Sequence, residues 1–194
     1  KTLKLMNFID LKAQQDLIQK DLEKRIKKVL SHGKYIMGPE VVELESILAK
    51  FIGSKYCVTV SSGTDALLIS LMSLGVKPGD EVITSPFSWV STAEVIVLLG
   101  AIPIFVDIDP DTCNIDHNKI EEKINSKTKV IMPVSLFGQP SDMSFINKIA
   151  KKHNVPVIED AAQSFGAMFK SKKSCNLSKV GCTSFFPSKP LGCY

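Results

Sequence analysis

The chain has 194 residues, of which 44% are hydrophobic, enough for one domain with a sizeable core or for a large domain cut short. Its formal net charge of +4 comes from 24 basic and 20 acidic residues spread along the sequence. The densest basic cluster, Lys24-Arg25 with Lys27-Lys28, lies on the polar side of a helical pattern, which favours a solvated helix face over a nucleic-acid-binding patch.

The first predicted element is an amphipathic helix. Apolar residues recur at three- and four-residue steps from Leu11 to Leu30, and His32-Gly33 ends the pattern. A loop over 35–39 follows, and Pro39 suits the first turn of a second helix, Glu40 to Ile52. We expect residues 1–37 to form an N-terminal helix and loop segment, and residues 38–194 to form the main domain.

Beyond Ile52, strands and helices alternate. The expected strands are Tyr56–Val60, Glu81–Thr84, Ile102–Val106, Val130–Leu136, Val155–Ile158 and Thr183–Phe186, and the expected helices are Thr64–Leu74, Thr92–Leu99, Asn118–Ile124 and Ser141–His153. The strands are continuous apolar runs, which is typical of strands covered on both faces. The pattern therefore predicts an α/β fold with a mostly parallel, mixed sheet between two layers of helices.

The turn Ser62-Gly-Thr-Asp-Ala66 joins a predicted strand to a predicted helix. Ligands of such sheets sit beyond the carboxyl ends of the strands. Gly63 allows a close backbone approach to an anion, the helix start offers unpaired N–H groups, and Thr64 adds a hydroxyl. The turn therefore indicates a phosphate cradle, although an ordinary capped helix start explains it equally well.

Two strand ends carry an acid and an amine. The apolar run Val157-Ile-Glu-Asp160 ends in a carboxylate, and Thr183-Ser-Phe-Phe-Pro-Ser-Lys189 delivers a lysine between two prolines. Pyridoxal phosphate needs an anion to keep its ring nitrogen protonated and an amine to hold its aldehyde. We predict that Asp160 and Lys189 have these roles. The alternatives are a helix cap for Asp160 and an ordinary surface cation for Lys189.

Other polar and aromatic residues support this interpretation. Trp89, the only tryptophan, follows a predicted strand end, so it is a candidate for stacking on a planar cofactor, although a core position is the alternative. Gln163 lies one turn beyond Asp160, within reach of a ring oxygen. Ser184 and Ser188 flank the lysine and could add phosphate contacts.

Several classes of protein are disfavoured. No stretch approaches the length of a membrane-spanning helix. The five cysteines include no Cys-x-x-Cys pair, which indicates a reducing, cytosolic compartment. The three histidines are isolated from one another and from any Cys or Asp cluster, so no metal site is predicted.

With these residues assembled, the chain resembles the DegT/DnrJ/EryC1/StrS sugar aminotransferases, which are fold-type-I pyridoxal phosphate enzymes. The resemblance rests on motifs along nearly the whole chain: Phe8-Ile-Asp-Leu-Lys12, Gly38-Pro39, Ser62-Gly-Thr-Asp-Ala66, Val106-Asp-Ile-Asp109, Glu159-Asp-Ala-Ala-Gln163 and Ser184-Phe-Phe-Pro-Ser-Lys189. It implies that Gly63, Thr64 and Ser184 bind phosphate, that Trp89 stacks on the ring, that Asp160 faces the ring nitrogen, that Gln163 contacts the ring oxygen and that Lys189 holds the cofactor covalently.

The resemblance also implies a reaction and its partners. Pyridoxal 5′-phosphate would transfer an amino group from L-glutamate to a nucleotide-linked ketosugar for surface polysaccharide, in a cytoplasmic homodimer with shared active sites. Residues 173–178 and 183–194 resemble a narrower group that aminates the 3-keto carbon of a UDP-linked 2-acetamido-glucuronate. Two positions depart from common family patterns, namely Trp89, where Phe or Tyr is frequent, and Ser135, where many members carry His.

Family members continue past the cofactor lysine into the rest of the large domain and a small C-terminal domain. We therefore expect an incomplete large domain here, truncated after Lys189, and a chain that associates poorly or aggregates without the rest of its sequence. The rival hypotheses are a catalytically incomplete fragment, a regulatory protein that retains the fold, and a sugar dehydratase of the same fold. Dehydratases of the family have His in place of the lysine, so Lys189 disfavours that activity.

Overall fold

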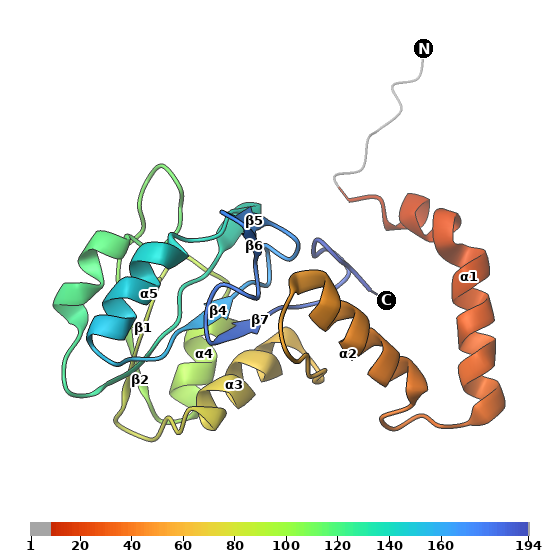
Figure 1. Cartoon of the computed structure of the whole chain (residues 1–194), viewed down its shortest axis with the longest axis horizontal. Helices are drawn as coiled ribbons and strands as arrows, with labels where there is room; N and C mark the ends of the chain where they lie inside the picture. The colour runs from red at the N-terminus through yellow and green to blue at the C-terminus, as the bar shows by residue number, and fades with distance from the viewer. Residues whose placement is uncertain (1–8, 194) are drawn as a thin grey trace, which may run out of the picture.

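The structure is a computed structural model that describes residues 9–193. Its helices are α1 (Leu11–His32), α2 (Pro39–Ile52), α3 (Gly63–Ser73), α4 (Ser91–Leu98) and α5 (Met143–Lys152), with short 3₁₀ turns η1 (His117–Lys119), η2 (Glu121–Lys123) and η3 (Leu136–Gly138). Its strands are β1 (Glu81–Thr84), β2 (Ile102–Phe105), β3 (Thr128–Ile131), β4 (Ile158–Asp160), β5 (Met168–Phe169), β6 (Lys172–Lys173) and β7 (Val180–Cys182). Figure 1 shows their arrangement.

The central layer is a parallel sheet. β1 pairs with β2 on one side and with β3 on the other, and β4 pairs with β7, in every case parallel. Parallel bridges from Ile131 to Val157 and from Val134 to Asp160 join the two groups. The strand order is therefore β2-β1-β3-β4-β7, which confirms the predicted α/β class, and the antiparallel pair β5–β6 is a separate hairpin.

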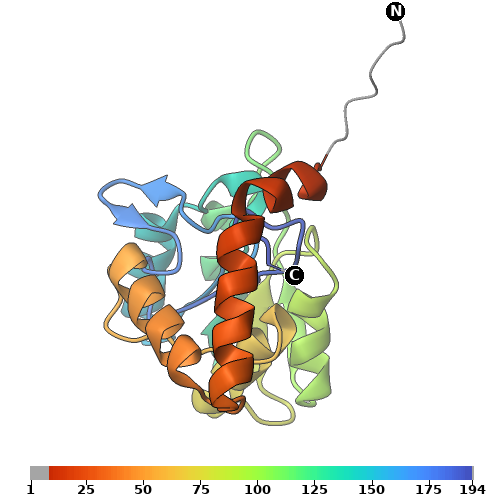
Figure 2. The ribbon, with the colours of Figure 1, turned by 90° about the vertical axis from the view of Figure 1, so that its right-hand side faces the viewer.

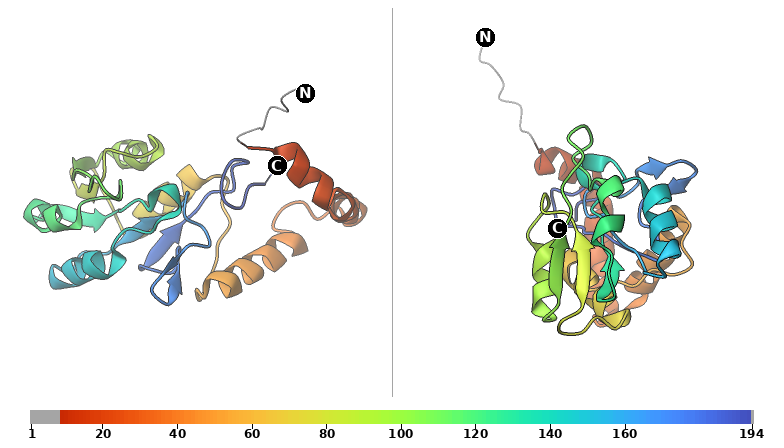
Figure 3. Two further views of the ribbon diagram at one scale, coloured as in Figure 1. Left: turned by 90° about the horizontal axis from the view of Figure 1, so that it is seen from above. Right: turned by 90° about the vertical axis from the view of Figure 1, so that its left-hand side faces the viewer.

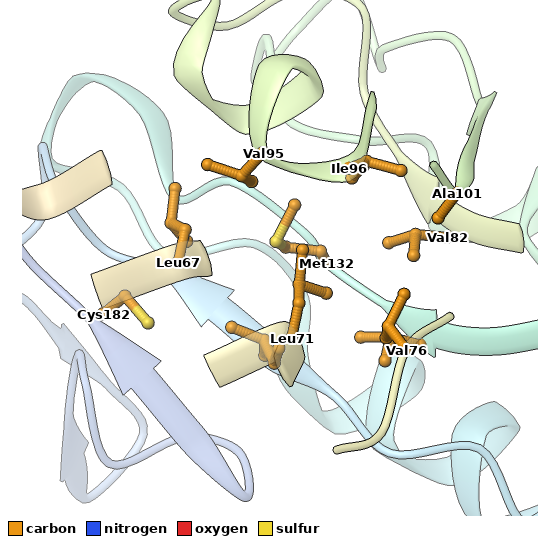
Figure 4. Close-up of a cluster of buried hydrophobic side chains, with 11 residues drawn as sticks. Leu67, Leu71, Val76, Val82, Val95, Ile96, Ala101, Met132 and Cys182 are labelled. Carbon is orange, nitrogen blue, oxygen red and sulfur yellow. The ribbon is translucent and has the colours of Figure 1, made fainter. Parts of the chain in front are cut away.

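Two apolar cores cover the two faces of this sheet. Val82, Val130 and Ile158 face α3 and α4, where they pack with Leu71 and Ile96, as Figure 4 shows for part of this cluster. Their sequence neighbours, such as Ile83, Ile131 and Val157, pack on the other face against α5. Because successive strand residues point to opposite faces, both neighbours must be apolar, which explains the continuous runs in the sequence. Figure 3 shows the strands between α4 and α5.

The first two helices extend away from this layer. Figures 1 and 2 show α1 at one end of the molecule, with α2 between it and the sheet. No residue of α1 is buried, and two ion pairs connect the helix to α2: Lys28 lies 3.1 Å and His32 3.2 Å from the Glu40 carboxylate. Gly33 ends α1 at φ 64°, a conformation that favours glycine. Within residues 9–193, no helix is long and apolar enough to cross a membrane.

Two predicted strands are wrong. The segment 56–60 is extended but pairs with no strand among the described residues, and its Thr59 N–H donates to the Glu45 carboxylate at 2.7 Å instead. Its apolar residues Tyr56 and Val58 are exposed. The segment 183–186 is irregular, and the strand that leads to it is Val180–Cys182. Apolar β-branched and aromatic residues favour extended backbone, but only a pairing partner makes a strand.

Other predicted elements differ from the observed ones in type or in their boundaries. The expected helix 118–124 consists of the 3₁₀ turns η1 and η2, the expected strand 130–136 ends at Ile131, and the strand predicted to end at Ile158 begins there. This last shift places Asp160 inside the sheet, where it pairs with Cys182. Phe8, the first residue of the N-terminal motif, lies outside the described residues.

Candidate active site

The carboxyl edge of the sheet brings together the polar groups predicted from sequence. β4 ends at Asp160, and β7 leads through Ser184 into the turn that carries Lys189. α3 begins at Gly63 beside this point, because a Cβ on Gly63 would lie 2.8 Å from the Cβ of Ser184 and 3.3 Å from its Oγ. Gly63 and Ser184, which are 121 positions apart in sequence, therefore meet at one edge, where such sheets bind ligands.

Asp160 is the buried acid of the site, with 5% of its surface exposed. Its Oδ2 accepts a hydrogen bond from Thr92 Oγ1 at 2.9 Å, and its Oδ1 accepts one from the Ala162 N–H at 3.2 Å. Burial raises the pKa of Asp160, while these two donors and the positive charge of Lys189 oppose that rise. A carboxylate held in this way is an anion that lacks water, so a cationic ring would be a favourable partner.

Lys189 lies near this acid in a tight turn. Its N–H donates to the Phe186 carbonyl at 2.8 Å, and the Cys193 N–H closes the turn on the Phe185 carbonyl at 2.9 Å. Gly192 is required here, because a Cβ would lie 2.1 Å from the Pro187 carbonyl oxygen. The Lys189 side chain is half-buried and makes no hydrogen bond or salt bridge among the described residues.

The start of α3 forms an anion cradle. Ser62 caps the helix by accepting the Asp65 N–H at 3.0 Å, which leaves the N–H groups of Gly63 and Thr64 without a partner in residues 9–193. The Ser184 hydroxyl lies beside these two donors. Asp65 turns away to accept hydrogen bonds from Ser61 at 2.5 Å and Ser62 at 2.8 Å, which lower its pKa. The remaining donors and the helix dipole suit a phosphate group.

Sequence reasoning missed a line of hydroxyl groups beneath the site. Because Thr92 donates to Asp160, it must accept the hydrogen bond that links it to Ser88 Oγ at 3.0 Å. Ser91 pairs with Thr64 Oγ1 at 2.9 Å, so the start of α4 is tied both to the acid and to the anion cradle. The available signal was a Ser and a Thr at the start of a helix that follows a strand on the ligand edge.

Gln163 and Trp89 lie on the same edge but in different settings. Gln163 Oε1 accepts the Phe137 N–H at 3.2 Å, whereas its Nε2 has no partner among the described residues and remains available as a donor. Trp89 lies two residues before α4 and is 72% exposed, so the core position is wrong for this residue. Its exposed indole is available to cover a ligand.

A second buried carboxylate, Glu159, was also missed. It is fully buried and accepts hydrogen bonds from Ser135 Oγ at 3.0 Å, Ser174 Oγ at 2.7 Å and the Cys175 N–H at 2.9 Å. Burial raises its pKa. Ser135 is therefore a structural partner of Glu159 rather than a surface residue of a ligand pocket. Cys175 in turn covers Gly181, where a Cβ would lie 2.4 Å from the Cys175 Cα.

The residues present fit pyridoxal phosphate. An anion cradle, a buried acid and a lysine converge at the carboxyl edge of a parallel sheet, and these three features match the phosphate, the ring nitrogen and the aldehyde of that cofactor. Within residues 9–193, no three His, Cys, Asp or Glu side chains form a metal-binding group. The fold and these groups define the large domain of a fold-type-I pyridoxal-phosphate-dependent transferase.

Comparison with known proteins identifies the family. Residues 16–194 match the DegT/DnrJ/EryC1/StrS aminotransferase family, and the chain belongs to it. A UDP-2-acetamido-2-deoxy-3-oxo-D-glucuronate aminotransferase from Pseudomonas aeruginosa is 60% identical over 190 residues, which cover 98% of this chain and 53% of that protein.

Solved structures show the same relationship. The structure of S. venezuelae DesV has a TM-score of 0.94 at 34% identity, and the match covers 97% of this chain and 51% of the DesV chain. The structure of NtdA from Bacillus subtilis, with bound cofactor PMP, has a TM-score of 0.91 at 36% identity and covers 99% of this chain and 43% of its own. The chain therefore spans about half the length of the relatives it matches.

Proposed function

We propose that this chain supplies the cofactor-binding domain of an aminotransferase that transfers an amino group to a nucleotide-linked ketosugar. The observation that carries the proposal is the pairing of β4 with β7, which brings the buried carboxylate of Asp160 and the turn with Lys189 to one edge of the sheet. A buried acid and a lysine at this edge, beside a helix start whose N–H groups lack partners, match the needs of a single planar phosphate-bearing cofactor.

Each candidate residue has a distinct part in this proposal. The N–H groups of Gly63 and Thr64 and the Ser184 hydroxyl bind the phosphate, and Trp89 covers the ring. Asp160 keeps the ring nitrogen protonated, and Thr92 and the Ala162 N–H hold that carboxylate in place. Gln163 donates from Nε2 to the ring oxygen.

Lys189 has two tasks. Its amine would hold the cofactor aldehyde and, when free, would move the proton from the α-carbon of the amino donor. The cofactor supplies an electron sink for the bond that breaks at that carbon.

The substrate is proposed from the relatives. The 60% identity to a UDP-2-acetamido-2-deoxy-3-oxo-D-glucuronate aminotransferase supports a UDP-linked 2-acetamido-3-keto-glucuronate as the amino acceptor. We further propose L-glutamate as donor, a role in surface polysaccharide synthesis, and a cytoplasmic location.

The amino-donor half of the reaction tests the function directly. Protein loaded with pyridoxal phosphate should lose its visible absorbance band on addition of L-glutamate, with release of an equimolar amount of 2-oxoglutarate. D-glutamate is the matched control, because the proton faces away from the Lys189 amine in that enantiomer. Stopped-flow absorbance with product analysis is the measurement. A stable band and no oxoacid with L-glutamate would rule out the proposed donor.

We also propose that the whole protein is a homodimer with shared active sites, in which the groove between α1 and α2 contacts the second copy. In this proposal, residues 1–37 are an N-terminal segment and residues 38–194 belong to the cofactor-binding domain. The supporting observation is an apolar groove between α1 and α2, lined by Ile26, Leu30, Leu44 and Ile47, of which Leu30 is 62% exposed. Closed two-fold association is the commonest way to bury such a surface.

Light scattering on the whole protein should give twice the mass of one chain. Leu30→Asp should shift the mass to that of a monomer, because a carboxylate in the interface is costly to bury. Leu17→Asp is the control, since Leu17 lies on α1 outside the groove and is already 88% exposed. A wild-type monomer that transaminates at full rate would exclude shared active sites.

A further inference from the structure

The turn that carries Lys189 has few attachments to the rest of the protein. Among the described residues, every hydrogen bond made by residues 184–193 stays inside that segment: Lys189 to Phe186, Cys193 to Phe185, and the Phe186 N–H to Ser184 Oγ. These bonds fix the shape of the turn but not its orientation toward Asp160. Side-chain packing must therefore supply that orientation.

Phe185 provides such a contact. Its ring packs edge-on against the ring of Phe165, with centroids 5.8 Å apart at an interplanar angle of 83°. Edge-to-face pairs at this separation are favourable beyond the area they bury, and they hold both rings in a defined direction. Phe185 also bears the carbonyl on which the turn closes, so the ring and the closure of the turn belong to one residue.

Phe165 is itself firmly placed. It lies in the turn that follows Asp160 and carries Gln163, where the Ser164 N–H donates to the Ala161 carbonyl at 3.1 Å. Ser164 Oγ lies 2.6 Å from Ser174 Oγ, which donates to the buried Glu159. The segment with the acid and the segment with the lysine therefore meet at the contact between the two rings.

A third ring closes the other side. Phe51, at the end of α2, stacks on Phe165 with centroids 5.5 Å apart at 25°. Phe51 is in turn held by Lys173, whose Nζ lies 3.7 Å from the ring centroid and donates to the Phe51 carbonyl at 2.7 Å. The three rings form a continuous aromatic bridge from α2, across the turn after β4, to the lysine turn.

We propose that Phe165 is a positioning residue for Lys189: the bridge Phe51–Phe165–Phe185 orients the lysine turn toward Asp160, so that the amine meets the cofactor aldehyde. This proposal rests on the proposed function of Lys189. Phe165 contacts neither the cofactor nor the substrate in it, and acts only through Phe185.

The test compares Phe165→Leu with wild type, with Phe145→Leu as the control. Leucine keeps an apolar side chain but loses both ring contacts. Phe145, which lies on α5, is also partly exposed and packs on a single ring, that of His117. Hydrogen exchange of the whole protein without cofactor measures the order of the turn, and stopped-flow absorbance with pyridoxal phosphate measures the rate of covalent attachment at Lys189.

In Phe165→Leu we expect amides of 185–193 to exchange about tenfold faster and attachment to slow by a similar factor, with both restored in Phe165→Tyr. Phe145→Leu should alter neither rate. Phe51→Leu leaves the lysine turn untouched and should change the exchange and attachment rates in the same direction but to a smaller extent. If Phe165→Leu does not fold, Phe51→Leu tests the proposal in its place. Unchanged exchange of 185–193 in the folded variants would overturn the inference. Absence of attachment at Lys189 in wild type would instead refute the proposed function, and exchange would still test the bridge.

Discussion

Replacing Lys189 with alanine is expected to abolish covalent binding of pyridoxal phosphate and to slow amino transfer from L-glutamate by roughly 10²- to 10⁴-fold, the range for loss of a positioned proton-transfer group. The variant loses both the amine that binds the aldehyde and the base that moves the donor proton. Because the Lys189 side chain makes no hydrogen bond among the described residues, its removal should leave the fold intact. Borohydride trapping followed by peptide mapping measures attachment, and single-turnover kinetics measure transfer.

Lys179→Ala and Lys172→Ala are the matched controls. Both lysines lie within 20 residues of Lys189 in the sequence and are exposed, so they represent ordinary surface cations. Wild type and both controls should carry the pyridoxyl group on the peptide that contains Lys189. A group found on Lys172 or Lys179 would show that the lysine turn is not the site of attachment.

The second large effect concerns Asp160. Asp160→Asn should raise the activation barrier for single-turnover transfer from L-glutamate by about 3–5 kcal/mol, which is the cost of removing one partner of a buried charge pair. Asparagine cannot hold the ring nitrogen in its protonated form, although it retains the shape of the side chain. Covalent attachment at Lys189 should persist, because the amine and the anion cradle are unchanged.

The same substitution should raise stability in the cofactor-free chain. Burial raises the pKa of Asp160, so the folded state binds this proton more tightly than the unfolded state does. The free energy of unfolding contributed by Asp160 therefore falls as pH rises from about 4, the ordinary pKa, through the raised value. Asparagine does not titrate, so the advantage of Asp160→Asn in urea unfolding should grow with pH across that window.

Asp142→Asn separates this role from helix capping. Asp142 caps α5 by accepting the Phe145 N–H at 3.0 Å, and asparagine caps a helix almost as well. The control should therefore leave the rate of amino transfer unchanged. If Asp160→Asn also leaves this rate unchanged, Asp160 is only a cap for the turn that follows it.

Asp160→Asn is thus expected to slow amino transfer and to stabilise the cofactor-free protein, a combination that is common for residues of functional sites. A carboxylate at the end of a buried strand is costly in the empty protein, and its hydrogen bonds from Thr92 and Ala162 offset only part of that cost. In the proposed function, a protonated cofactor ring would supply the missing positive charge. The burial of Asp160 would then lower the stability of the cofactor-free protein and provide a defined electrostatic environment for the bound ring.

Some polar residues of the candidate site could be predicted from the sequence, and others could not. Asp160 and Lys189 were predicted because each follows an apolar run. The end of such a run indicates where a buried strand reaches the carboxyl edge of the sheet, at which ligands bind. Thr92 and Ser88 were missed because hydroxyl residues near a helix start are common, and nothing in the local sequence shows that Thr92 lies 2.9 Å from a residue 68 positions later. Glu159 was missed for the same reason, since its partners come from two separate segments, Ser135 in one and Ser174 with Cys175 in the other.

The sequence by itself determined the fold class and indicated which residues could form the site. Paired apolar neighbours such as Val82-Ile83 and Val130-Ile131 can be buried only in a sheet covered on both faces, and this property is local. Pairing is not local. The run 56–60 has the composition of a strand but no partner, whereas Val180–Cys182 becomes a strand because β4 lies beside it. Tertiary structure alone decided which extended segments pair, which hydroxyls meet Asp160, and that three phenylalanines far apart in the chain meet behind the lysine turn.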